Sequence, residues 1–349
     1  MLYWVRMKGL TNQLDEEILL GRRFPRKKDE RGHFFRDTTA IIHSYPFRRL
    51  KHKTQVFFSP KNDHICTRIE HVMHVASIAA AVCRGLDLDA DLAWAIGLGH
   101  DLGHTPFGHV GEKVMDRLKQ ENGLGGFIHE LYSLRVVDYL ARYGTGLNLT
   151  YAVRDGIVNH CGEKFEQAIR PDFRYKELGE LTARDQYPST WEGAVVRMAD
   201  KVAYLGRDVE DAVQLKIIEK EAIPDSAVRV LGTTNSEIIS SLVSDLIETS
   251  QQRGAIGFGD DAFVAMKELK EFNYQQIYRN PILTDYHRYF ERVLRTLYDY
   301  LSEMFEIAGF DYERYKTEKN LLSVRFGDYV LKMKPFYEEV DGGFGNLVF

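Results

Sequence analysis

Residues 94–112 hold the densest group of chemistry-bearing side chains in this chain of 349 residues. The group comprises His100, Asp101, His104, His109 and Glu112. It follows an apolar run typical of a buried helix, and such helices rarely end in several titratable residues unless these bind something. Imidazole and carboxylate groups together suit a divalent metal ion, and the glycines between them allow backbone to approach a ligand closely. The alternative is an ordinary capped helix end, in which the histidines form hydrogen bonds within the protein and bind no ligand.

Two further candidate metal ligands lie on other expected helices. Residues 67–84 have a wide apolar face and predict a helix, with His71 among its buried positions and Arg68 just before it. Residues 191–211 predict another helix, in which Asp200 follows an apolar run that should bury it. A buried carboxylate needs a metal ion or a cationic partner. Taken alone, His71 would be interpreted as a structural histidine.

Together these positions form a candidate metal site. Its four ligands are His71, His100, Asp101 and Asp200. Two imidazoles and two carboxylates leave coordination positions open for water and a phosphate oxygen. Tyr204 and Asp208 follow Asp200 at four-residue intervals, so they share its helix face, although a solvated polar face is the alternative.

Helical periodicity covers most of the chain, and strand signals are sparse. Further helices are expected at residues 90–101, 127–143, 151–160, 235–250, 261–271 and 282–307. A few strands are expected near Leu322–Lys334, so the predicted fold class is mostly α with a minor β element near the C-terminus. The expected organisation is an N-terminal basic wrapping segment (1–60), a core (61–215) and a helical extension packed on it (216–349).

Composition is that of an ordinary soluble globular protein, with 44% hydrophobic and 28% charged residues. The apolar runs are too short for a membrane span, and the N-terminus lacks the features of a secretory signal. The three cysteines are scattered, which favours a reducing, cytoplasmic setting.

The overall net charge of −5 does not indicate nucleic-acid binding, but the N-terminal region is strongly basic. Its cationic residues are Arg22, Arg23, Arg26, Lys27, Lys28, Arg31, Arg36, Arg48, Arg49, Lys51 and Lys53. The block is either a solvated basic face or a local site for phosphates.

The order of the four candidate ligands, H…HD…D, resembles the HD-domain superfamily of metal-dependent phosphohydrolases, which has a helical fold. Motifs at residues 41–51, 53–57, 67–71 and 100–112 follow one another in the same order. Together they resemble the dGTPase-type deoxynucleoside triphosphate (dNTP) triphosphohydrolases over about residues 20–300. The resemblance implies an HD core with additional helices and a divalent metal ion, for which Mn, Mg, Fe, Co, Ni and Zn all suit the ligand set.

The resemblance implies hydrolysis of a dNTP, with dGTP among the expected substrates, to a 2′-deoxynucleoside and inorganic triphosphate. Water would attack the α-phosphorus. His109 is then the best candidate for protonating the 5′-oxygen, and Glu112, three residues further on, would orient it. His129 would contact the α-phosphate, while His104 is either a second phosphate contact or a structural histidine.

Further residues match positions that would hold the substrate. Arg68 and Lys201 are cations for the triphosphate, and Tyr204 offers a hydroxyl. Gln55 and Asp208 match residues that would recognise the sugar 3′-hydroxyl. Tyr278, with Tyr274 as the alternative, is a candidate for the wall that excludes ribose.

The resemblance also implies a homo-oligomer, a tetramer or hexamer, with single-stranded DNA or a regulatory nucleotide as a further partner and no membrane. Two other functions stay open. One is a different HD phosphohydrolase, a 5′-nucleotidase or a phosphodiesterase acting without a triphosphate. The other is an oligomer that binds nucleotides or single-stranded DNA with little turnover.

Overall fold

The computed structural model describes residues 9–27, 29–53, 56–58, 62–162, 164–184, 186–339 and 343–348. Over these ranges the chain is largely helical, which confirms the mostly α prediction. The β structure found there is one antiparallel pair of two-residue strands, β1 (Ala168–Ile169) and β2 (Ile256–Gly257). It therefore lies in the middle of the chain and not near the C-terminus.

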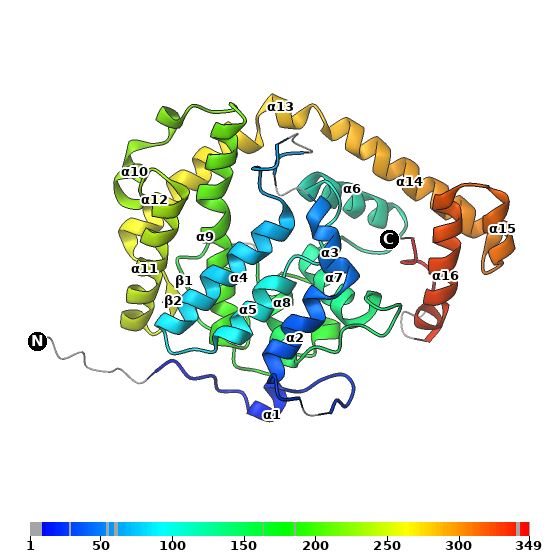
Figure 1. The fold of residues 1–349 in the computed structure, drawn as a ribbon, viewed down its shortest axis with the longest axis horizontal. Coiled ribbons are helices and arrows are strands. Elements are labelled where there is room, and N and C mark those ends of the chain that lie inside the picture. The colour runs from blue at the N-terminus through cyan, green and yellow to red at the C-terminus, as the bar shows by residue number, and fades with distance from the viewer. Residues whose placement is uncertain are drawn as a thin grey trace, which may run out of the picture.

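A central bundle positions most of the chemistry-bearing residues (Figure 1). It consists of α2 (His33–Ile42), α4 (Arg68–Gly85), α5 (Ala90–Gly99), α8 (Tyr151–Val158) and α9 (Trp191–Gln214). Helix α5 is apolar on all sides and packs against each of the other four. Its C-terminal end, where His100 and Asp101 follow, therefore lies inside the protein.

Local signals in the sequence fix where these helices begin. Thr67 caps α4 in a reciprocal arrangement with Glu70, whose carboxylate accepts the Thr67 backbone N–H at 2.7 Å. Asp89 caps α5 by accepting two backbone N–H groups, and the Thr190 hydroxyl accepts the Gly193 N–H at 3.0 Å to start α9. These caps set the register of the ligands that follow.

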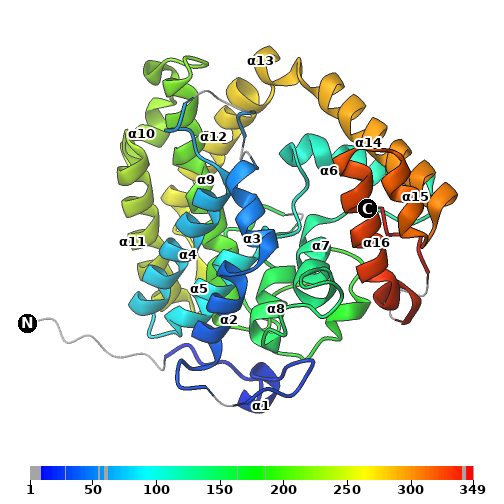
Figure 2. The same ribbon diagram turned by 45° about the vertical axis from the view of Figure 1, so that its right-hand side comes forward.

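Two further helices lie beside the bundle and bring in other histidines. They are α6 (Gly108–Glu121) and α7 (His129–Arg135), and a π-helical turn (Val136–Leu140) continues α7. Figure 2 shows α6 and α7 between the bundle and the C-terminal helices.

The remaining helices surround this centre. On the N-terminal side are α1 (Glu16–Leu19), α3 (Tyr45–Arg49) and the 3₁₀ turn Leu50–His52. Beside α9 and beyond it are α10 (Asp225–Leu231), α11 (Asn235–Arg253), α12 (Asp260–Phe272), the π-helical turn Asn273–Tyr278 and α13 (Pro281–Thr284). At the C-terminal side are α14 (His287–Ala308), α15 (Tyr312–Thr317) and α16 (Leu321–Glu339).

The prediction of strands near Leu322–Lys334 is wrong, because this stretch belongs to α16. Its buried residues include Phe326, Val330 and Met333, spaced by four and three positions. That spacing places them on one helical face, whereas a half-buried strand would alternate every two residues. The aromatic and β-branched content of the stretch favoured strands, and its period favoured a helix.

Two hydrophobic cores hold the described residues together. The larger runs from Leu19 to Ile277 and draws on all three of the segments expected from the sequence. The smaller lies within residues 304–347 and includes the fully buried Tyr315. The segment boundaries at 60 and 215 stay a prediction.

Among the helices described, none is both long and apolar enough to cross a membrane. All three cysteines are in the described part of the chain and carry free thiols, with Cys66 and Cys83 buried.

The contact between α4 and α5 depends on Gly97. A Cβ placed there would lie 2.6 Å from the Cα of Ala76, which is backbone and cannot yield locally. We expect Gly97→Ala to lower the free energy of unfolding by about 1–3 kcal/mol, because overpacking outweighs the roughly 1 kcal/mol gained in helix propensity. Urea unfolding measures this. Gly179→Ala is the control, since nothing lies within 4 Å of its added Cβ, and equal stability of the two variants would contradict the prediction.

Candidate functional site

The four candidate metal ligands converge at the centre of the bundle. His71 Nε2 lies 3.1 Å from Asp200 Oδ1, and His100 Nε2 lies 3.9 Å from the same oxygen. Asp101 adds Oδ1 at 3.4 Å from His100 Nε2. Ligand atoms of His71, His100 and Asp101 lie within 4.8 Å of one another. Side chains from α4, α9 and the end of α5 are thus arranged around one point.

The His100 ring is oriented as a metal ligand requires. Its Nδ1 lies 2.7 Å from the backbone oxygen of Gly97, so this nitrogen carries the proton and Nε2 keeps its lone pair. Nε2 is buried and has no hydrogen-bond partner among the described residues. Burial lowers the pKa of His100 to about 4, so the ring is neutral at pH 7. A buried lone pair that faces two carboxylates fits a divalent cation.

Both carboxylates at this point are ionised. Burial alone would raise the pKa of Asp101, but the neighbouring imidazoles and the Arg68 guanidinium, whose Nη1 lies 2.5 Å from Asp101 Oδ2, hold it well below its usual range. Burial opposes ionisation of Asp200 too, and His71 and His100 lower its pKa nonetheless. Arg68 therefore reaches the ligand cluster through Asp101, and its expected role toward a triphosphate stays a prediction.

A second cluster adjoins the first and contains His104, Glu112 and His129. His104 connects the two clusters, with Nε2 3.3 Å from Asp101 Oδ1 and Nδ1 2.5 Å from Glu112 Oε1. The His129 ring stacks on that of His104 at 4.0 Å, and His129 Nδ1 lies 3.3 Å from Glu112 Oε1. Burial would raise the pKa of Glu112, yet its contacts with three histidines hold it well below the usual range.

His109 differs from the other histidines because it is exposed. Its side chain is 82% accessible, and Nδ1 lies 3.3 Å from Glu112 Oε2. The expected i, i+3 pair forms because α6 begins at Gly108. His109 therefore stands at the edge of the second cluster, held by Glu112 and free to meet a ligand.

The loop between α5 and α6 folds around close backbone contacts. A Cβ on Gly103 would overlap the backbone of Tyr132 and Ser133, and one on Gly111 would overlap the carbonyl of Pro106. The sequence suggested that these glycines allow backbone to approach a ligand. In the structure they allow close contact with other parts of the protein's own backbone. Phe107 has a left-handed φ of 66°, and its ring stacks on Phe290 at 4.3 Å, which offsets the strain.

The residues expected to face the sugar form a pair. The Tyr278 hydroxyl donates to Asp208 Oδ2 at 2.5 Å, and Asp208 is buried while Tyr278 is partly buried. Burial raises the pKa of Asp208 to about 7 and that of Tyr204, one turn before it, above its usual range. Tyr274, the alternative to Tyr278, is exposed and lies under the guanidinium of Arg279.

Two other predicted residues stand apart from the clusters. Lys201 donates to Glu166 Oε2 at 2.9 Å and lies over the Phe165 ring. One residue along a helix turns the side chain by about 100°, so Lys201 faces away from the point that Asp200 reaches. Gln55 lies outside the described residues.

The sequence analysis missed two site residues, His160 and Glu130, and named a third, Lys53, only as part of the basic block. His160 is buried after α8, with Nε2 3.3 Å from His129 Nε2 and 4.0 Å from Asp101 Oδ1. Glu130 is buried beside His129 and the guanidinium of Arg184. Lys53 donates to the backbone oxygen of His104, and burial lowers its pKa to about 7. A titratable residue ending an apolar helix, the signal that identified His100, also marks His160.

The arrangement is suited to phosphoryl chemistry. One cluster can hold a divalent cation, and the adjoining one supplies imidazoles for contacts to phosphate oxygens and for proton transfer. The Arg68 guanidinium contacts Asp101 in the first cluster, and Lys53, which contacts the His104 backbone, adds positive charge where it is protonated. Such a site favours a substrate with several negative charges.

Comparison with known proteins identifies the class. Residues 68–205 match the HD domain, and HD domains bind divalent metal ions. These residues contain all four candidate metal ligands. The helical fold and the H…HD…D set therefore define a protein of the HD-domain class.

Curated relatives narrow the class. A deoxyguanosinetriphosphate triphosphohydrolase-like protein of Desulfatibacillum aliphaticivorans is 39% identical over 82% of this chain and 79% of its own length. The protein of the same description from Caldanaerobacter subterraneus subsp. tengcongensis is 39% identical over 78% and 76%. One from Clostridium perfringens (strain 13) is 34% identical over 95% and 92%. The chain belongs to the family of deoxyguanosinetriphosphate triphosphohydrolase-like proteins, which confirms the resemblance.

The raised pKa of Asp208 makes stability depend on pH. Between about pH 4 and 7 the unfolded chain has released this proton while the native chain keeps it, so this group alone lowers the free energy of unfolding as pH rises, on the order of 1.4 kcal/mol per pH unit. His100, whose pKa burial lowers, acts in the opposite direction below about pH 6.5, so the comparison between variants is the test. We expect the free energy of unfolding of the wild type to fall relative to that of Asp208→Asn as pH rises across that range, as measured by urea unfolding. Exposed Asp261→Asn is the control, and parallel curves for Asp208→Asn and the wild type would refute the assignment.

Proposed function

We propose that this protein is a metal-dependent hydrolase that converts dNTPs, dGTP among them, to 2′-deoxynucleosides and inorganic triphosphate. The observation that carries the proposal is the contact between the two clusters, in which His104 touches both Asp101 and Glu112. A cation site and a set of imidazoles for proton transfer thus share one centre. The family relationship supports the same reaction class.

His71, His100, Asp101 and Asp200 would hold the ion, and the buried Nε2 lone pair of His100 fits it. When bound, the ion supplies Lewis acidity toward a phosphate oxygen and lowers the pKa of water, while its identity within the expected group stays a prediction. The chain's own residues then position the phosphates and move the protons.

The residues of the second cluster would donate and accept the protons that the reaction requires. We assign proton donation to the leaving 5′-oxygen to His109, because it is the exposed imidazole and Glu112 orients it. His129, held between Glu112 and Glu130, would donate to an α-phosphate oxygen. His104 both orients these groups and borders the phosphates.

The substrate's charge and sugar would meet the remaining residues. Arg68 and Lys53 lie beside the first cluster and would pair with phosphate oxygens. Asp208 and Tyr278 would bind the 3′-hydroxyl and close the space beside the 2′-carbon. Roles for Gln55, Tyr204 and Lys201 stay predictions, and Lys201 would first have to leave Glu166.

The expected homo-oligomer, tetramer or hexamer, and the cytoplasmic location stay predictions as well. So do the alternative activities, which product analysis distinguishes. A 5′-nucleotidase releases orthophosphate from a monophosphate, a phosphodiesterase cleaves a diester, and a binding oligomer releases little of either.

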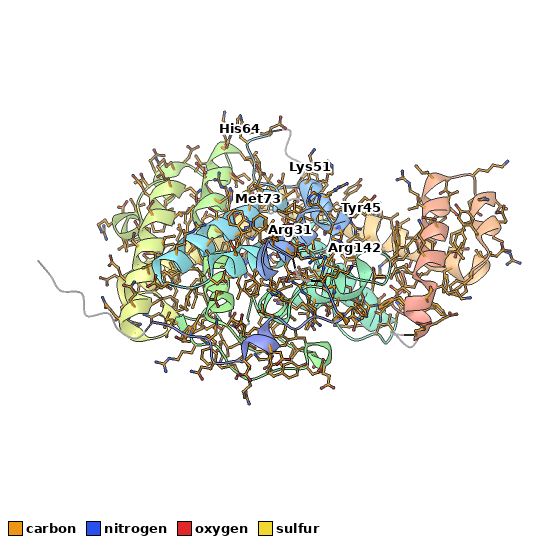
Figure 3. All side chains as sticks on the ribbon, turned by 60° about the horizontal axis from the view of Figure 1, so that its bottom comes forward. Arg31, Tyr45, Lys51, His64, Met73 and Arg142 are labelled. Atoms are coloured by element: carbon orange, nitrogen blue, oxygen red, sulfur yellow. The ribbon has the colours of Figure 1, made fainter. Side chains whose placement is uncertain are left out.

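Product analysis tests the reaction and the role of His109 together. With each dNTP and Mn or Mg, we expect the wild type to release triphosphate, resolved from pyrophosphate and orthophosphate by ion chromatography. His109→Ala should lower kcat by about 100- to 10,000-fold, as expected for loss of a general acid, with little change in substrate affinity. His64→Ala, a change at another exposed histidine (Figure 3), is the matched control. Release of orthophosphate alone, or full activity in His109→Ala, would overturn the assignment.

Metal analysis tests the first cluster without reference to turnover. We expect about one divalent ion per purified chain, lost in His100→Ala and kept in His64→Ala, by inductively coupled plasma mass spectrometry. Because a ligand stabilises the state that binds it, chelation should remove about 3–4 kcal/mol of apparent stability when the ion exceeds its Kd by 100- to 1,000-fold. Equal metal content in both variants would place the ion elsewhere.

A further inference from the structure

We propose that a cavity between α9, α10 and α11 binds a small uncharged aromatic molecule that carries one hydrogen-bond donor, such as a phenol. The cavity has a volume of about 160 Å³. Its apolar lining includes Val209, Ala227, Val228, Leu231, Ile238 and Leu269. None of these residues belongs to the histidine clusters or to the pair expected to face the sugar, so the proposal goes beyond the proposed function and does not depend on it.

Small residues on two helices leave this space in the packing. Helix α10 packs against α11 and α12, and these helices lie beside α9 at one end of the molecule (Figure 1). Gly206 of α9 and Ala227 of α10 both line the cavity and provide little side chain to fill it. Protein interiors are close-packed, with few voids larger than a water molecule. A gap of this size is therefore a distinct feature of the fold.

The larger hydrophobic core fixes the walls of the cavity. Ala227 and Leu231 of α10, Ile238 of α11 and Leu269 of α12 are buried members of that core. Residues around a cavity relax into it only partially, because they are packed against other neighbours as well. A ligand would thus enter a space that is already formed, and little free energy would be lost in ordering its walls.

The volume of the cavity fits one aromatic ring. An apolar cavity of roughly 150 Å³, lined by leucine, isoleucine and phenylalanine, stays dry and binds benzene in another protein. The present cavity is of similar size and is lined by valine, leucine and isoleucine. Cavities that enclose a drug-sized molecule span roughly 300–1,000 Å³, so a nucleoside or a nucleotide is too large for this one.

One polar group of the lining lacks a partner. Asn235 is 9% exposed, and its Oδ1 is buried without a hydrogen-bond partner among the described residues. The threonines before it are used in capping α11, because the Thr233 hydroxyl donates to Glu237 Oε2 and the Thr234 hydroxyl accepts the Glu237 N–H. Buried acceptors are normally satisfied. A hydroxyl or N–H group on the ring would supply the missing donor.

The charges at the cavity favour an uncharged ligand. Glu210 and Lys220 line it, and they are opposite in sign and exposed. Glu210 is also paired with Arg207 at 2.7 Å. The lining therefore offers no buried charge to an ion, and an ion that leaves water without such a partner loses free energy. This separates the cavity from the histidine clusters, where buried carboxylates and an arginine suit ionic ligands.

The cavity and the candidate metal site lie on opposite sides of α9. At about 100° per residue, the apolar α9 residues of the lining point away from Asp200 and Asp208. They are Gly206, Val209 and Val213. Binding in the cavity can therefore be measured without a metal ion or a nucleotide, and its outcome is independent of the proposed hydrolysis.

NMR titration of the full chain with phenol, in chelator and without nucleotide, tests the cavity. We expect one saturable binding event that weakens at least tenfold in Ala227→Leu and in Val228→Phe, because both add side chain where the lining faces the space. Val230→Phe, at an exposed valine of the same helix outside the lining, is the matched control and should bind as the wild type does. If Ala227→Leu does not fold, the partly exposed Val228 position decides the test. No saturable binding by the wild type, or equal affinity in all the variants, would overturn the proposal.

Further probes distinguish the chemistry of the occupant. Benzene lacks the donor, so it should bind more weakly than phenol, and Asn235→Ala should remove that difference. Equal affinities of the wild type for the two, or tighter binding of benzoate than of phenol, would overturn the assignment of an uncharged donor. Sedimentation tests the remaining occupant, a side chain from a second copy of the chain. A smaller assembly in Val228→Phe, with no phenol binding by the wild type, would assign the cavity to that contact and overturn the proposal.

Discussion

The hydrogen bond from His100 Nδ1 to the Gly97 carbonyl is the interaction on which the site depends. It leaves the Nε2 lone pair facing Asp101 and Asp200, where a proton on that nitrogen would repel a cation. The bond forms at the C-terminal end of α5, where residues 95–99 are all buried inside the protein. Helix α5 can lie that deep because Gly97 lets it approach α4 at Ala76. A packing constraint on one glycine thus fixes the chemistry of an imidazole three residues away.

Charge compensation explains why so many titratable groups can lie close together inside the protein around the candidate metal site. Asp101 is fully buried and Asp200 is partly buried, and removing a carboxylate from water costs free energy unless opposite charges compensate. Arg68 supplies one compensating charge, and the geometry leaves room for a divalent cation to supply the rest. The negative charge of Glu112 is instead stabilised by contacts with three histidines. The two clusters are therefore one electrostatic unit with His104 as the shared member.

The candidate ligands could be proposed from the sequence because adjacent titratable residues at the end of an apolar helix are rare, and because their order matched a family pattern. The fold class and most helix positions followed from periodicity. The same signal, a titratable residue at the end of an apolar helix, marks the position of His160 but not its role in the site, because a single histidine after a helix is usually structural and the contact with His129 is a tertiary one. Nor could the sequence show that Lys201 pairs with Glu166, since that partner lies on a polar excursion with no periodic pattern. Residue identity and spacing predict which face a side chain shares, and tertiary packing decides what it meets.

His160 also determines what His129 can do. The Nδ1 of His160 lies 2.7 Å from the Ile157 carbonyl and so carries a proton, which leaves its Nε2 as an acceptor toward His129. The other nitrogen of His129 lies 3.3 Å from Glu112 and 3.4 Å from Glu130. The contact with His160 thus sets the tautomer of His129, because it places a proton on Nε2. In the proposed reaction, a histidine that touches no substrate would therefore set which nitrogen of its neighbour carries a proton.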